Sequence, residues 1–552
     1  MKTIILFLSL IVMSQGIHAQ DVYKSQRASW MEKAEASKPK LNETIYHPLH
    51  LVMPVHDTKA FQCWRMEKSE EMTALYNVSF KHKKECIVDF GRHMTGHYSF
   101  KLTTLSRAQD APLRIKFTFG EMPAELNTAF DPYLGTLSRA WLQDEVITIT
   151  DIDKYITIPR RLACRYVKIE LLGASSDFDF GMTDMYFTAT SSVSDINPVL
   201  QQTASQDIRD IDRVSIETLK ECMQTVYEDG PKRDQRLWIG DMYLESLANS
   251  YSFKKPDLTK HCLYLLAGLS AEDGRLHANV FERPEPHPQF GSFCLTYSLL
   301  YNVALLEYLK TTNDKETALD LWPVVKNQVA DALSYLNDDY IFDKTKKNSF
   351  VWLFLDWREG LDDNTPIQGL LPFALEKSYE LAKMLGKEKE AKEWLSVSGK
   401  MKQAARKQLY NAKEGYFVSG ADKQISVMSQ IWMILSGTLN AKEGRKALGK
   451  VMSMDNAVRL GAPYAYHYLI ESMIKCNMNN EAKKLLVDYW GGMVKKGADT
   501  FWEVYDPNDD YLSPYNFFPV NSYCHAWSCT PVYFIHKYPE IFQTSPTHLH
   551  KQ

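Results

Sequence analysis

The period of the hydrophobic pattern changes along the chain, between about residues 192 and 207. Before this point apolar and polar residues alternate, as in Leu113-Arg114-Ile115-Lys116-Phe117, which is typical of strands with one buried face. After it, apolar residues recur every three or four positions, as at Leu375, Tyr379 and Ala382, which is typical of amphipathic helices. A chain of 552 residues is also too long for one hydrophobic core. The sequence therefore predicts a strand domain followed by a helical domain.

The alternating segments predict an antiparallel β-sandwich over residues 80–192. They lie at 86–90, 98–102, 113–119, 146–149, 166–171 and 182–189, with Gly, Asp and Pro between them. Several short strands separated by turn residues are typical of a sandwich. The preceding residues, 20–79, are polar and irregular, so we expect a lead-in segment there. Thr190-Ser191-Ser192 marks the expected end of the strand domain.

The helical region, residues 200–540, predicts an (α/α)6 toroid, a closed ring of six helical hairpins. Roughly twelve helix-length segments are joined by short loops, which make consecutive helices antiparallel neighbours. No exact repeat is visible, so an open solenoid of the common repeat types is less favoured. Loops at one end of such a ring gather around its axis, where distant segments can share one pocket. Later helices are predicted at 371–385, 387–409, 426–439, 441–452, 464–476 and 480–494.

The N-terminus predicts export. Lys2 is followed by an apolar run of about ten residues and by Ala19, a pattern typical of a secretory signal peptide over residues 1–19. The run is too short to span a bilayer, and a second long apolar run is lacking. We therefore expect a protein exported from a bacterial cytoplasm, periplasmic or secreted, without membrane insertion. The net charge of −4 predicts no nucleic-acid partner.

A charged loop joins two predicted helices at Asp229-Gly230-Pro231-Lys232-Arg233-Asp234-Gln235-Arg236-Leu237-Trp238-Ile239-Gly240-Asp241. It holds three carboxylates, three cationic side chains and a Trp within thirteen residues. Gly-Pro is expected to break the helix before it, and Asp241 can cap the helix after it. Such a loop suits a sugar-cleaving site, because glycoside hydrolysis needs carboxyl groups. The simpler interpretation is a capped turn with surface ion pairs.

Three further segments place a Trp close to a carboxylate or a His: 354–362, 497–506 and 521–528. Trp offers a flat apolar wall for a sugar ring, and two carboxyl groups can serve as proton donor and base. Asp229, Asp234 or Asp241 could pair with Glu503 in this way. Each of the other residues has a structural alternative, because Asp356 can pair with Arg358, His525 can be a hydrogen-bonded core residue, and the Trp side chains can fill the core.

These segments together resemble the six-hairpin catalytic domain of the α-L-rhamnosidases, family 78 of the glycoside hydrolases. The resemblance spans roughly 300 residues in the family's order, and the strand region looks like the accessory domain that precedes the toroid. It implies an inverting exo-hydrolase that releases terminal L-rhamnose from plant or algal glycans. Glu503 would be the general base, and Asp234 or Asp229 the general acid. The resemblance assigns sugar binding to Asp241, Arg233, Trp238, Asp356, Trp357, Trp502 and His525.

The sequence departs from the family pattern at Gln235, where the family usually has the Glu that acts as general acid. An amide cannot donate a proton as a carboxylic acid does, so Asp234 or Asp229 would replace it, or the site would be inactive or altered. Many members continue into a C-terminal strand domain, whereas this sequence ends at Gln552, so a more open cleft is expected there.

Two other functions stay open at this point. One is a glycan-binding protein without catalysis, which Gln235 favours. The other is another glycosidase or a polysaccharide lyase on the same ring, which could recruit Arg233, Tyr523 and His525. No metal or other cofactor is expected, because the His and acidic residues are spread out and no metal-binding motif appears.

Overall fold

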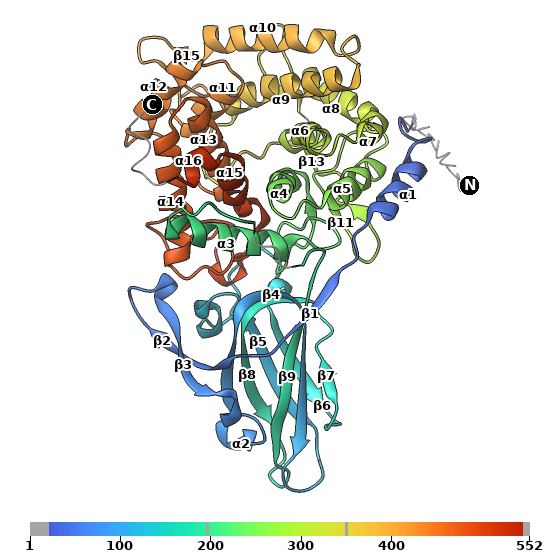
Figure 1. Cartoon of the computed structure of the whole chain (residues 1–552), viewed down its shortest axis with the longest axis vertical. Coiled ribbons are helices and arrows are strands. Elements are labelled where there is room, and N and C mark those ends of the chain that lie inside the picture. Colours follow the sequence, from blue (N-terminus) through green and yellow to red (C-terminus); the bar gives the residue numbers. More distant parts are fainter. Residues whose placement is uncertain (1–20, 195–197, 348–350, 545–552) are drawn as a thin grey trace, which may run out of the picture.

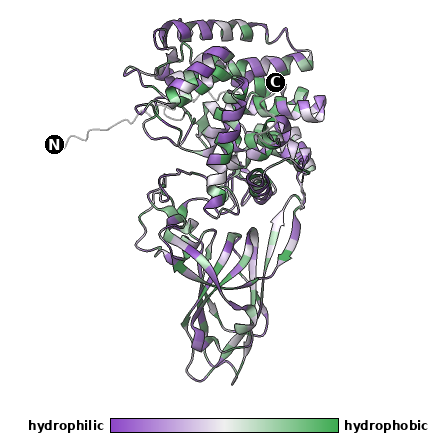
Figure 2. Ribbon diagram, turned by 60° about the vertical axis from the view of Figure 1, so that its left-hand side comes forward, coloured by the Kyte–Doolittle hydropathy of each residue, from purple (hydrophilic) through white to green (hydrophobic). Residues whose placement is uncertain are grey.

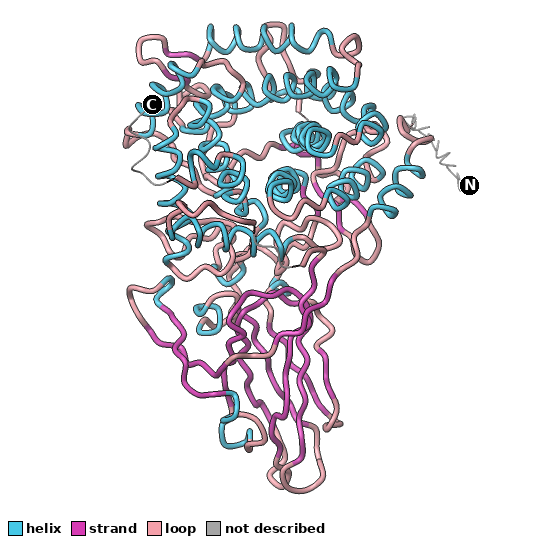
Figure 3. The backbone as a smooth tube through the Cα atoms, in the orientation of Figure 1, coloured by secondary structure: helices cyan, strands magenta, loops and turns pink. Residues whose placement is uncertain are grey.

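The computed structural model describes residues 21–194, 198–347 and 351–544. The predicted signal peptide, 1–19, lies outside these residues. The strand domain occupies one end of the molecule and the helical domain the other (Figure 1). Figure 3 shows the same division, with the strands of the first domain in magenta below the helices in cyan. The predicted order, an antiparallel β domain followed by a ring of helices, is confirmed.

The strands of the first domain form one nine-stranded sheet. Its order is β1 (Asn42–Tyr46), β9 (Phe180–Ser191), β4 (Glu85–Thr104), β8 (Leu162–Gly173), β5 (Leu113–Gly120) and β6 (Asp144–Ile149). Off this path lie β2 (His50–His56), β3 (Trp64–Glu71) and β7 (Tyr155–Thr157). All of these pairings are antiparallel.

Strand β4 pairs with different strands along its length. Its first half pairs with β2 and β8, and its second half pairs with β9 and β7. The register shifts between Asp89 and Met94, where Gly91 takes a φ of +77° that favours glycine. The two predicted strands 86–90 and 98–102 are therefore one bent strand. Its buried residues, including Val88 and Tyr98, pack in the core of the domain.

Residues 20–79 differ from the predicted irregular lead-in. They form α1 (Arg27–Ser37), which packs against α5 (Pro256–Gly268) of the helical domain, and strands β1 to β3 of the sheet. Helix α1 buries only Trp30 and Ala34, so its apolar period is too weak to recognise in the sequence. Strand β3 is mostly exposed and charged, which hides its alternation.

The helical domain is a ring of six hairpins in the described part of the chain. Its inner helices are α4 (Ile239–Tyr251), α6 (Leu295–Thr312), α9 (Asn364–Leu385), α11 (Val427–Leu435), α13 (Pro463–Lys475) and α15 (Pro531–Lys537). The outer helices are α3 (Gln206–Cys222), α5, α8 (Trp322–Ser334), α10 (Lys392–Gln408), α12 (Ala441–Met452) and α14 (Asn479–Lys495). The inner helices line a common cavity, and outer helices α14 and α3 pack together where the chain closes the ring.

Burial explains the two layers. Helix α6 is buried along almost its whole length, as expected for a helix enclosed on all sides. Outer helix α10 buries only one face, and in Figure 2 it is largely hydrophilic in colour at the top edge of the molecule. The connections that precede or follow the inner helices carry the segments singled out in the sequence, and they meet in one cavity beside the strand domain.

Candidate active site

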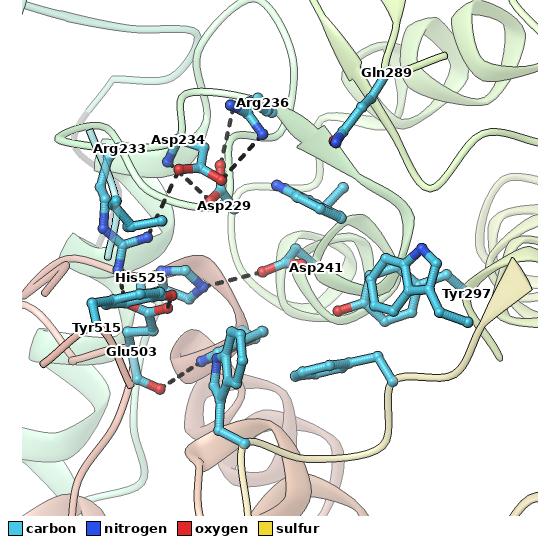
Figure 4. A pocket seen from close by; sticks show the side chains of 16 residues that line it. Asp229, Arg233, Asp234, Arg236, Asp241, Gln289, Tyr297, Glu503, Tyr515 and His525 are labelled. Atoms are coloured by element: carbon cyan, nitrogen blue, oxygen red, sulfur yellow. Dashed lines mark hydrogen bonds and ion pairs between the residues drawn. The ribbon is translucent and has the colours of Figure 1, made fainter. Parts of the chain in front are cut away.

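A cavity of about 280 Å³ collects side chains from all the segments predicted to carry chemistry (Figure 4). Cavities that bind small molecules usually start near ~300 Å³, so this one suits a ligand the size of a single sugar ring. Its lining consists of Leu137, Asp229, Arg233, Asp234, Arg236, Trp238, Asp241, Gln289, Tyr297, Trp352, Phe354, Trp357, Glu503, Tyr515, His525 and Trp527.

The charged loop at residues 229–241, called the early loop below, is bounded by helices that end and begin at other residues than predicted. Helix α3 stops at Cys222, seven residues before Asp229, so Gly230-Pro231 is not what ends it. Helix α4 begins at Ile239 with Trp238 at its N-cap. Asp241 therefore lies inside the first turn of α4 instead of capping it, and its carboxyl group faces the cavity.

Asp229 is a buried carboxyl group that organises the loop. Its Oδ2 accepts the backbone N–H of Asp234, and its Oδ1 accepts that of Arg236, both at 3.0 Å. Its own backbone carbonyl accepts the N–H of Ala526 at 2.7 Å. This bond joins the early loop to residues 521–528, called the late segment below. Burial, together with the neighbouring charges of Asp234 and Asp241, raises the pKa of Asp229 to about 8. Asp229 is therefore protonated at neutral pH.

Asp234 lies beside two guanidinium groups. Its Oδ2 is 3.4 Å from Arg236 Nη1, and its Oδ1 is 3.9 Å from Arg233 Nη1. The loop thus places Asp234, beside two cationic side chains, next to the protonated carboxyl group of Asp229.

Glu503 is buried among groups that stabilise its anion. Its carboxylate pairs with Arg233 and accepts the hydroxyl of Tyr515. It also accepts the backbone N–H of Ser522 at 3.4 Å. Burial alone would raise the pKa of Glu503, but Arg233, His525 and these hydrogen bonds outweigh it and hold the pKa below its ordinary value. Glu503 is therefore an ionised base at neutral pH, in the same cavity as the protonated Asp229.

Asp241 and His525 lie next to each other in the cavity lining and have unused hydrogen-bonding capacity. His525 Nε2 lies 3.4 Å from Asp241 Oδ1. Among the described residues, Asp241 Oδ1 and both ring nitrogens of His525 lack a hydrogen bond of good geometry. Buried polar atoms without partners are costly, so these atoms suit hydroxyl groups of a bound ligand.

Aromatic side chains form the remaining walls. Trp238 packs edge-on against Tyr297 and Trp352, and Phe354 stacks on Trp527 with their ring centres 5.7 Å apart. Trp357 is 40% exposed, which places an apolar surface at the mouth of the cavity. Rings arranged around carboxyl groups fit the amphipathic faces of a sugar.

Three residues lie elsewhere than the sequence suggests. Asp356 is outside the cavity lining, because its oxygens accept the backbone N–H groups of Trp357 and Gly461 at 2.8 and 2.7 Å. Trp502 is 1% exposed and stacks on Phe61 of the strand domain, with ring centres 4.1 Å apart. Gln235 also lies outside the lining, since its amide donates to the carbonyl of Pro231 at 2.7 Å. The predicted sugar-binding roles of Asp356 and Trp502 are thus not supported by their positions.

Several lining residues are absent from the sequence prediction. Tyr515, which donates to Glu503, follows a stretch of loop without a periodic pattern. Leu137 belongs to the β5–β6 connection of the strand domain, which packs against Tyr515. Arg236, Phe354 and Trp527 lie within segments already singled out and so carried a usable signal.

In the described part of the chain, no group of three or more His, Cys, Asp or Glu side chains is arranged to hold a metal ion. The helices among the described residues also include none that is long and apolar enough to cross a membrane.

The closed helical ring and its cavity of carboxyl and aromatic groups define a six-hairpin glycosidase. The chain belongs to the family 78 glycoside hydrolases, the α-L-rhamnosidases. Residues 48–189 match the glycosyl hydrolase family 78 alpha-rhamnosidase N-terminal domain. Residues 200–538 match the bacterial alpha-L-rhamnosidase 6 hairpin glycosidase domain. The family predicted from the sequence motifs is confirmed.

Solved structures agree with this assignment. A rhamnosidase from Klebsiella oxytoca with rhamnose bound is 35% identical, with a TM-score of 0.89, covering 93% of this chain and 99% of that one. A family 78 rhamnosidase of Bacillus sp. GL1 is 21% identical, with a TM-score of 0.66, over 82% of this chain and 46% of its own. The α-L-rhamnosidase of Streptomyces avermitilis is 14% identical, with a TM-score of 0.62, over 90% of this chain and 44% of its own.

The last two similarities concern the fold alone, and this chain spans a little under half the length of those two enzymes. No match is found among curated proteins.

Proposed function

We propose that this protein is an exported exo-α-L-rhamnosidase that inverts the configuration of the sugar it releases. The observation that supports this best is the opposite pKa shift of two carboxyl groups in one cavity, upward at Asp229 and downward at Glu503. Environments that push two pKa values apart mark the acid and the base of a catalytic pair. Export rests on the signal-like residues 1–19. The substrates would be rhamnose-containing plant or algal glycans, as the family resemblance suggests.

In the proposed reaction Glu503 removes a proton from a water molecule, whose oxygen attacks the anomeric carbon of L-rhamnose. Asp229 gives its proton to the glycosidic oxygen as the bond to the anomeric carbon breaks. Arg233 joins the base to the early loop, because it pairs with Glu503 and its Nη1 lies 3.9 Å from Asp234 Oδ1. Inversion needs space for a water molecule beside the base.

The sugar would be held by side chains of the lining whose hydrogen-bonding capacity is not fully used. Asp241 Oδ1 and the ring nitrogens of His525 can bind hydroxyl groups, and Trp238 and Trp527 offer apolar surfaces to the ring. The rhamnose bound to the Klebsiella oxytoca rhamnosidase supports the same ligand here. Trp357, at the mouth, would contact the part of the glycan that leaves.

The test is Glu503→Gln, with hydrolysis of an aryl α-L-rhamnoside followed by NMR. In the unsubstituted protein the first product should be β-L-rhamnose. The variant should lose about 10²–10⁴-fold in kcat, the usual contribution of a general base, and should still bind rhamnose in calorimetry. Retained turnover would exclude Glu503 as the base, and α-L-rhamnose as the first product would exclude inversion.

A glycan-binding protein without turnover is the second candidate, because Gln235 replaces the family's acid. It predicts rhamnoside binding in calorimetry without any product after long incubation. The buried, protonated Asp229 favours the hydrolase, since it offers another proton donor to the cavity.

A further inference from the structure

A buried ionic cluster joins the strand domain to the early loop. Lys232, next to Arg233, has a side chain that is 1% exposed. Its ammonium group donates to Glu121 Oε2 at 3.2 Å and to Glu125 Oε1 at 2.6 Å, both in the strand domain just after β5. A buried lysine needs such partners, because an unpaired charge in the interior is very unfavourable.

Glu121 contacts the late segment as well as the early loop. It accepts the backbone N–H of Tyr523 at 2.8 Å, and it lies 2.9 Å from His93 Nε2 on β4. Glu125 in turn accepts the backbone N–H groups of Glu121 and Met122 at 2.8 and 2.7 Å. One carboxylate, fixed within its own domain, thus holds both segments that enclose the cavity.

The segment Val520–Tyr523 connects this cluster to the proposed base. The carbonyl of Val520 accepts Arg233 Nε at 2.6 Å, and the carbonyl of Asn521 accepts Lys232 Nζ at 2.6 Å. Ser522 exchanges hydrogen bonds with Glu503, since its carbonyl accepts the Glu503 N–H at 3.0 Å and its N–H donates to Glu503 Oε2. Successive residues of one short segment therefore align Arg233, Lys232 and Glu503.

Two other ion pairs reach from β8 and the turn before it to the same motifs. Arg161 Nη2 lies 2.7 Å from Glu228 Oε2, one residue before Asp229. Arg165 Nη1 lies 2.7 Å from Asp499 Oδ2, four residues before Glu503. These two pairs also join the domains. Of these three interdomain contacts, the one through Lys232 lies nearest to Arg233, because Lys232 is its neighbour in the chain.

We propose that Glu121, assisted by Glu125, is a positioning residue of the hydrolase: through Lys232 and Tyr523 it holds Arg233 and the Val520–Tyr523 segment in register with Glu503. The strand domain then completes the catalytic geometry of the helical ring. This inference rests on the proposed role of Glu503 as base. A displacement of about 1 Å at a catalytic group can cost about 100-fold in rate, so a contact at this position can control turnover without touching the substrate.

The experiment compares Glu121→Gln with Glu217→Gln. The first removes one of the two negative charges that bind Lys232 and keeps the side-chain shape. The second breaks the 2.8 Å pair between Glu217 on α3 and Arg92 on β4, which also joins the two domains but lies outside the cavity lining. We expect kcat to fall about 10–100-fold in Glu121→Gln, with KM within about twofold, and to stay within about twofold in Glu217→Gln.

The pH profile separates positioning from loss of folded protein. Arg233, Tyr515 and His525 face Glu503 and stabilise its anion, while Asp241 adds an opposing negative charge. When Arg233 moves away, burial raises the pKa of Glu503, and the acid limb of kcat/KM moves to higher pH. A purely structural defect lowers the amount of active protein and leaves the position of this limb unchanged.

A second variant provides the test if Glu121→Gln does not fold. The triple change Glu121→Gln, Glu125→Gln and Lys232→Met removes the three charges that meet at Lys232, and such replacements of buried ion networks often keep stability. It should show the same shift of the acid limb. Wild-type kcat and an unmoved limb in either variant would overturn the proposal. Glu503→Gln is measured in parallel. If it is inactive while the cluster variants behave as wild type, only the positioning role of Glu121 is excluded. If Glu503→Gln turns over, the assignment of Glu503 as the base is excluded as well.

Discussion

The charge of Asp234 provides a direct test of which carboxyl group donates the proton. Asp234→Asn keeps the backbone N–H that Asp229 accepts but removes the negative charge beside it. Burial is the largest cause of the rise in the Asp229 pKa from 3.8 to about 8, and the charge of Asp234 is the second. Removing the charge of Asp234 should therefore lower the Asp229 pKa, while burial keeps it above the ordinary value of an Asp.

A general acid works only below its pKa, so a lower pKa of Asp229 moves the alkaline limb of kcat/KM to lower pH. We expect Asp234→Asn to keep nearly full kcat/KM at the pH optimum and to move this limb to lower pH. The acid limb should stay in place, because Arg233 still pairs with Glu503. The assay is kcat/KM against pH with an alkyl α-L-rhamnoside, whose poor leaving group needs protonation.

The opposite outcome has a clear meaning. If Asp234→Asn loses about 100-fold or more at every pH while the limbs of the residual activity stay in place, Asp234 itself is the donor and Asp229 is not. Asp229→Asn is the matched comparison. It should lose about 10²–10⁴-fold with the alkyl rhamnoside and much less with a nitrophenyl rhamnoside, whose leaving group needs little help from an acid.

Two other substitutions test the cavity. Gln235→Glu should lower the free energy of unfolding by about 1–3 kcal/mol, because a carboxylate would face the carbonyl of Pro231, and it should leave kcat no higher; a clear gain in kcat would show that residue 235 can reach the substrate. Asp241→Asn should weaken rhamnose binding about 10-fold or more, since a buried acceptor is partly replaced by a donor; rhamnose-induced stabilisation in thermal unfolding measures this, and an unchanged shift in Tm would place the sugar elsewhere.

The strongly periodic parts of the structure could be predicted from the sequence. Residues 441–452 are predicted as a helix, and α12 has these bounds because Asn440 and Glu443 form a capping box at its start. Residues 387–409 are predicted as one helix, yet α10 begins only at Lys392. The first residues of that stretch form turns after Gly386, which has a φ of +71° and ends α9.

The contacts between the domains could not be predicted. Lys232 and Glu121 are 111 residues apart in sequence, and each is of a residue type that is normally exposed. Alternation and helical period describe how an element faces its own domain, but they carry no information about which charged side chains pair across an interface. The position of Trp502 is a second example. The sequence predicts its ring in the cavity, but the ring packs on Phe61 of the strand domain, a contact that no pattern within either segment indicates.

The loop around Gln235 shows why residue type at one position does not decide which group is the acid. The backbone N–H groups of Asp234 and Arg236, on either side of Gln235, both point to Asp229. Gln235, between them, adopts a φ of +60° and bonds back to Pro231. This turn places Asp229 at the cavity wall and surrounds it with burial and negative charge, the two conditions that stabilise a neutral carboxyl group. The proposed proton donor thus depends on the environment that the turn creates, and any substitution that opens the turn should cost activity even if all carboxyl groups remain.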